Sequence, residues 1–112
     1  MPVERFENLV AEALDGIPDE LGRLIENVAV FVMEGDGNPN LLGLYEGIPL
    51  TRRENYGIGL AMPDRITIYR QPILMRCATE ADVVHMVRIT VVHEVGHHFG
   101  IDDRRLHELG YG

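Results

Sequence analysis

The chain has 112 residues, of which 46% are hydrophobic, and it carries a formal net charge of −8. This length fits a single domain spanning residues 1–112, and the apolar content is sufficient for a hydrophobic core. The negative charge argues against nucleic acid as a partner and against attachment to an anionic membrane surface. One cysteine excludes an intrachain disulfide, and the absence of serine excludes a serine nucleophile.

The beginning of the sequence gives an expectation about location. Residues 1–18 contain acidic residues early and no apolar run of signal-peptide length. No stretch approaches the roughly 20 apolar residues that a membrane-spanning helix needs. We therefore expect a cytoplasmic protein.

The first elements in chain order are two helices. Between Phe6 and Leu14, apolar side chains recur at spacings of three and four residues, which predicts an amphipathic helix over residues 3–14. Pro18–Glu20 places a proline and two acidic residues at a favourable helix start. A short second helix is therefore expected as far as Ile25.

Three strands are expected in the middle of the chain. Residues 28–34 are rich in β-branched side chains, and residues 41–45 predict a second strand after a turn at 35–40. Residues 65–70 alternate in side-chain character, which is the clearest strand pattern in the sequence. Residues 46–64 contain prolines and glycines and are expected to form a loop.

The last third of the sequence predicts one long helix and a short one. Thr79 is expected to be the N-cap, with Asp82 as the acid of a capping box. The helix should continue to Phe99 and end at Gly100 in a left-handed C-cap. A last helix is expected over residues 102–109. Together these elements predict an α+β fold, in which a small mixed sheet packs on the long helix and the N-terminal helices cover it.

The long helix and the turn after it carry a pattern typical of a metal site. His93 and His97 are four residues apart, so they share one helix face and their imidazoles can converge on one ion. Glu94 lies about 100° around the helix from His93, where it can take a proton from a water. Gly100 allows the chain to turn back, and Asp103 can then supply an oxygen ligand.

This pattern, His93-Glu94-x-x-His97-x-x-Gly100-x-x-Asp103, resembles the extended motif of zincin metallopeptidases in its aspartate form, and the short chain is similar to the minimal zincins. The resemblance implies a zinc ion held by His93, His97 and Asp103, with Glu94 as the general base. It also implies that residues 65–70 correspond to the edge strand that holds an extended peptide substrate by strand addition.

The sequence departs from the family pattern in two ways. Metzincins have a methionine turn after the third ligand, whereas every methionine here precedes Asp103. Only residues 104–112 follow Asp103, which is too little for a C-terminal subdomain, so we expect a shallow site. The leading hypothesis is a zinc-dependent peptidase that acts on a peptide or protein. The alternative is a metal-binding or partner-binding module with weak or no proteolysis.

Several other residues stay open as participants. His107 is an alternative third ligand, whereas Asp102 is expected to be the N-cap of the last helix. His98 and His85 point away from the shared face of His93 and His97. The group that stabilises the oxyanion is not distinguished by the sequence; the candidates are Tyr45, Tyr56, Tyr69, Tyr111 and His107. Substrate specificity and oligomeric state are not predicted.

Overall fold

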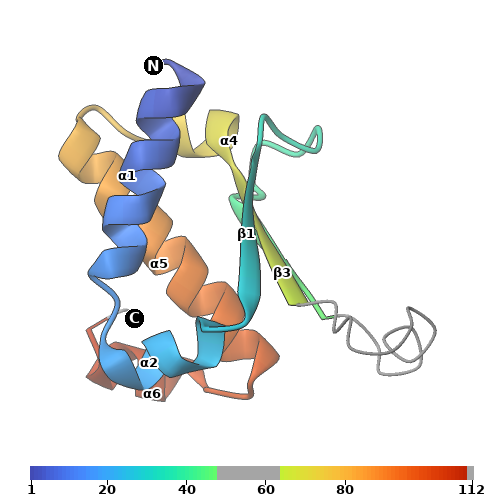
Figure 1. Ribbon diagram of the computed structural model, residues 1–112, viewed down its shortest axis with the longest axis vertical. Helices are drawn as coiled ribbons and strands as arrows, with labels where there is room; N and C mark the ends of the chain where they lie inside the picture. The colour runs from blue at the N-terminus through green and yellow to red at the C-terminus, as the bar shows by residue number, and fades with distance from the viewer. Residues whose placement is uncertain (48–63, 111–112) are drawn as a thin grey trace.

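The computed structural model describes residues 1–47 and 64–110, and Figure 1 shows their arrangement. The helices are α1 (Val3–Asp15), α2 (Asp19–Gly22), the 3₁₀ helix η1 (Arg23–Ile25), α4 (Arg70–Leu74), α5 (Glu80–His98) and α6 (Asp103–Glu108). The strands are β1 (Val28–Met33), β2 (Gly43–Glu46) and β3 (Asp64–Tyr69). The predicted α+β fold is therefore confirmed. No helix in these two ranges is long and apolar enough to cross a bilayer.

The three strands form one mixed sheet with the order β1-β3-β2. β1 pairs with β3 in parallel, with Val30 opposite Ile66, and β2 pairs with β3 antiparallel, with Tyr45 opposite the same isoleucine. Helices α1 and α5 pack side by side on one face of this sheet (Figure 1). The long helix therefore lies against the sheet, as the sequence predicts.

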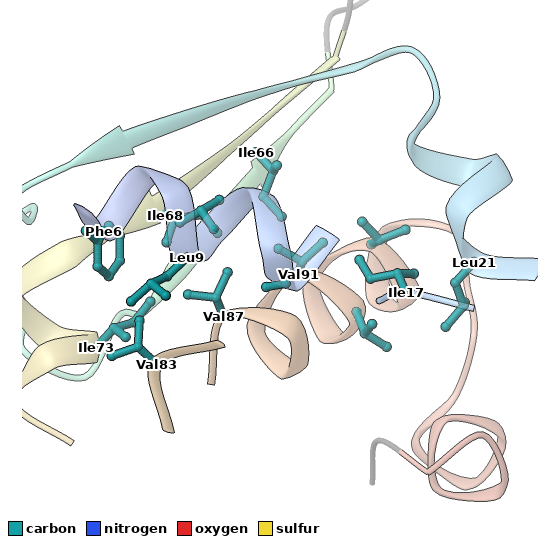
Figure 2. Close-up of a cluster of buried hydrophobic side chains, with 14 of the residues drawn as sticks. Phe6, Leu9, Ile17, Leu21, Ile66, Ile68, Ile73, Val83, Val87 and Val91 are labelled. Carbon is teal, nitrogen blue, oxygen red and sulfur yellow. The ribbon is translucent and has the colours of Figure 1, made fainter. Parts of the chain in front are cut away.

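The hydrophobic core fills the space between α1, α5 and the sheet (Figure 2). Phe6 and Leu9 enter it from α1, Ile66 and Ile68 from β3, and Val87 from α5, and all five are almost fully buried. Burial of a large aliphatic or aromatic side chain contributes roughly 1.5–3 kcal/mol to the free energy of unfolding. This core fixes α5, the helix that carries the candidate metal ligands, relative to the sheet.

One prediction about the strands needs correction. The strand predicted over residues 65–70 as an edge strand is β3, which lies in the centre of the sheet, so both of its edges are already hydrogen-bonded. β3 is therefore not available for strand addition by a peptide. Strand order depends on contacts between distant segments, and the alternating pattern carries no information about it. Among the described strands, β1 and β2 lie at the edges.

The bounds of other elements also differ from the prediction. Glu46 and Asp64 belong to β2 and β3, so strands reach into both ends of the segment predicted as a loop. Gly47 lies outside the strands, and residues 48–63 lie outside the described residues. Arg70 begins helix α4 and does not continue β3. Helix α4 was not predicted.

The predicted start of α5 is confirmed in detail. The Thr79 hydroxyl accepts a hydrogen bond from the Asp82 amide at 3.1 Å, and the Asp82 carboxylate accepts one from the Thr79 amide at 3.1 Å. Ala78 donates a further backbone hydrogen bond to Asp82 at 3.0 Å. These backbone hydrogen bonds, Ala78's first, hold the pKa of Asp82 below its ordinary value. The helix therefore has a defined beginning, far from the motif at its other end.

Replacement of Thr79 by alanine removes the hydroxyl of this capping box. We expect Thr79→Ala to lower the free energy of unfolding by about 1 kcal/mol, the usual cost of losing an N-cap side chain. Urea denaturation followed by circular dichroism measures this change. Thr79→Ser keeps the hydroxyl and is the matched control. Equal stabilities of the alanine and serine variants would contradict a stabilising role for the cap.

Candidate metal centre

Helix α5 presents two histidines near its C-terminal end. His93 and His97 are one turn apart, and their rings meet edge to face with centroids 5.8 Å apart and an interplanar angle of 88°. His93 is half-buried, while the His97 side chain is 58% exposed. The four-residue spacing therefore brings the two imidazoles together on one face, as the sequence predicts.

The chain reverses direction immediately after these histidines. Gly100 has a φ of +76°, the left-handed conformation expected of a C-cap glycine. The Ile101 amide donates to the Gly96 carbonyl at 2.7 Å, and the Gly100 amide donates to the His97 carbonyl at 3.3 Å. This pair of hydrogen bonds is a Schellman motif, and it ends α5 while directing the chain back toward it.

Helix α6 brings the third predicted ligand back to the histidines. Asp102 is its N-cap, as predicted, and accepts a hydrogen bond from the Arg105 amide at 2.8 Å. Leu106 is fully buried and packs directly on Gly96, where an added Cβ would lie only 3.1 Å from a Leu106 methyl carbon. Asp103, in the first turn of α6, therefore faces the end of α5.

The structure brings His93, His97 and Asp103 into one group. One ligand atom from each lies within 4.8 Å of the others, and His97 Nε2 is 3.2 Å from Asp103 Oδ1. Two imidazole nitrogens and one carboxylate oxygen form a donor set that suits zinc and leaves a fourth position for water or substrate. The spacing of the donors and their chemistry thus both fit a single ion. The Asp103 side chain is 83% exposed, so the group lies at the surface.

Glu94 lies on the side of α5 that faces strand β2. Thr90, one turn before it, packs against Gly43, where an added Cβ would lie 2.7 Å from the threonine methyl carbon. His98, one turn after it, stacks on the ring of Tyr45. Since residues four apart share a helix face, Glu94 lies on the stripe between these two contacts. It is half-buried.

The other histidines take different positions. His98 stacks on Tyr45 with ring centroids 3.9 Å apart, and its Nε2 lies 4.0 Å from an Asp64 oxygen. His107 is exposed on α6 and His85 is exposed in the first half of α5. Within the described residues, neither belongs to a group of side chains close enough to hold an ion.

Two of the four tyrosines that are candidates for stabilising the oxyanion lie at opposite ends of the sheet. Tyr45 lies at the end of the sheet that contacts His98. Its hydroxyl donates a hydrogen bond to Asp64 Oδ2 at 2.9 Å. Tyr69 is at the opposite end of β3, five residues beyond Asp64 and hence about 16 Å away. It is buried, and burial raises the pKa of its hydroxyl. Tyr56 and Tyr111 lie outside the described residues.

Asp64 is the residue near the motif that the sequence did not identify. It stands directly before the strand pattern that begins at Arg65, and nothing in the local sequence distinguishes it from a solvated acid. Its proximity to Tyr45 and His98 arises from the pairing of β2 with β3 and the packing of the sheet on α5. Such a contact between distant segments has no local signature.

Comparison with known proteins assigns the chain to a family. A comparison with curated proteins gives no match. The family model described as zincin-like metallopeptidase matches residues 19–112, which includes the sheet, all of α5 and the turn to α6. Because this match covers most of the chain, the protein belongs to the family of zincin-like metallopeptidases.

Proposed function

We propose that this protein is a zinc-dependent peptidase in which His93, His97 and Asp103 hold the ion and Glu94 is the general base. The observation that carries the proposal is the convergence of the three donor side chains to within 4.8 Å at the end of one helix. Membership of the metallopeptidase family supports the same reaction class. The substrate class is a peptide or protein.

The chain's own residues have distinct tasks in this proposal. A zinc ion at this position would supply Lewis acidity and lower the pKa of a coordinated water. Glu94 accepts the proton of the attacking water on its carboxylate and then donates it to the leaving amine. Its position on the stripe that faces β2 separates this carboxylate from the face that carries His93 and His97. This helix position supports the role of Glu94 as a base that is not itself a ligand.

A second candidate function is a metal-binding module without useful proteolysis. The exposure of the ligands favours it, because the His97 and Asp103 side chains are 58% and 83% exposed. Catalytic electrostatics gain strength when water is excluded from the site. The two functions share the same ligands and differ in whether Glu94 takes part in turnover.

Removal of the third ligand tests the metal site directly. We expect Asp103→Ala to weaken zinc binding by more than the roughly 10–100-fold that loss of an outer-sphere partner costs. His107→Ala, on the same short helix, should bind zinc as the wild type does. Isothermal titration of Zn²⁺ into the metal-free proteins at neutral pH measures both affinities. Weak zinc binding by His107→Ala, with wild-type binding by Asp103→Ala, would make His107 the third ligand.

Replacement of the proposed base separates binding from catalysis. We expect Glu94→Gln to retain stoichiometric zinc, because the amide leaves the three ligands in place. Peptide hydrolysis should fall by at least about 10²–10⁴-fold, the usual contribution of a general base. Metal analysis and turnover of a fluorogenic peptide library measure the two effects.

The matched control is Glu4→Gln, the same change at an exposed position in the first turn of α1. It should leave both zinc content and turnover unchanged. Full activity of Glu94→Gln would contradict the assigned mechanism. Stoichiometric zinc in the wild type with no cleavage across the library would favour the second candidate function.

A further inference from the structure

Strand β2 contacts the last turn of α5 through an aromatic cluster. The Tyr45 ring stacks on the His98 ring, with centroids 3.9 Å apart and an interplanar angle of 27°. Phe99 meets both rings edge to face, at 6.0 Å from Tyr45 and 5.0 Å from His98. Aromatic pairs in these geometries stabilise a contact beyond the apolar area they bury. The cluster therefore joins a strand to a helix end by directional contacts.

A carboxylate fixes the orientation of the stacked pair. The Tyr45 hydroxyl donates to Asp64 Oδ2 at 2.9 Å, and His98 Nε2 lies 4.0 Å from the same oxygen. The Asp64 side chain is only 20% exposed. Gly47 adds a close backbone approach, since a Cβ at this position would lie 3.0 Å from His98 Cε1. The two rings are thus held from the sheet side by both polar and steric contacts.

The last turn of α5 is held by contacts from outside the helix as well as by the Schellman hydrogen bonds. The final carbonyl groups of a helix have no partners within it, and helix ends open more readily than helix centres. His97 lies in this turn, and its own side chain is largely exposed, so burial does not hold it. Two contacts fix its neighbours: His98 against Tyr45, and Gly96 against Leu106. The backbone of His97 is held between them.

We infer that the stack of Tyr45 on His98, oriented by Asp64, positions His97 as a metal ligand. The inference rests on the proposed zinc site and deepens it, because it assigns positioning residues outside the ligand set. Tyr45 acts through its ring, and its hydroxyl is directed to Asp64. Loss of the ring lets the last turn of α5 sample other conformations, and each departure from the ligand geometry reduces the apparent affinity for zinc.

The test compares zinc affinity with stability in the same variants. Tyr45→Ala removes the stacked ring, whereas Tyr45→Phe keeps the ring and removes only the hydroxyl. We expect Tyr45→Ala to bind Zn²⁺ about tenfold more weakly than the wild type, at the low end of the range for loss of an outer-sphere partner. Tyr45→Phe keeps the stack but loses its hydrogen bond to Asp64, so its affinity should lie between those of the wild type and Tyr45→Ala. Zn²⁺ titration and the visible absorption of the Co²⁺-loaded proteins measure the strength and geometry of the site.

Three further variants keep the inference falsifiable if Tyr45→Ala does not fold. His98→Ala removes the same stack from the helix side, and it should weaken Zn²⁺ binding to a similar degree. His85→Ala is the matched control, because it is the same change at an exposed position of the same helix. Val83→Ala creates a void at a fully buried position in the first half of α5, and should lower stability without changing the affinity of the folded protein.

The outcomes separate this inference from the proposed function. If the wild type binds Zn²⁺ and both Tyr45→Ala and His98→Ala bind it equally well, the positioning role is wrong while the zinc site stands. If Val83→Ala weakens binding as much as His98→Ala, the effect is one of overall stability and the inference is overturned. If the wild type binds no Zn²⁺, the proposed function fails and the positioning role fails with it.

Discussion

The candidate site depends on the reversal of the chain that begins at Gly100. A left-handed residue at this point allows the Ile101 amide to reach back to the Gly96 carbonyl at 2.7 Å. Without that turn, α5 and the segment after it would diverge, and Asp103 would not return to the two histidines. A residue with a side chain would be strained at this position, because the backbone φ is positive. A backbone constraint of one residue thus determines whether two helical histidines become part of a three-donor group.

The reversal is held by packing on both sides of the last turn of α5. On one side, the buried side chain of Leu106 lies against Gly96. On the other, the sheet contacts the same turn through the stack of Tyr45 on His98. The core of α1, α5 and β3 fixes the rest of the long helix, so that both contacts act on a rigid element. The site is at the surface, yet the backbone that carries it is anchored in the core.

The parts of this arrangement that follow from local rules could be predicted from the sequence. The spacing of His93 and His97, the capping box at Thr79 and the glycine after the helix each act within a few residues, so the sequence shows them directly. The relation of β3 to its neighbours could not be predicted, because strand order is set by contacts between distant segments. Tyr45 was only one of several candidates for the same reason: pairing of β2 with β3 brings its hydroxyl to Asp64, and no local spacing indicates that contact.

The exposure of the donors bears on how such a site binds an ion. Exposed His97 and Asp103 side chains lose rotamer freedom when they coordinate, which costs free energy, whereas buried side chains have already lost it on folding. A six-residue helix such as α6 is too short to be stable alone, so its position depends on the Asp102 cap and on burial of Leu106. The position of Asp103, the proposed third ligand, therefore depends on the few contacts that hold this short helix in place. If these residues hold an ion as proposed, its affinity and the stability of the C-terminal turn are coupled, because an ion that binds only the folded turn also stabilises it.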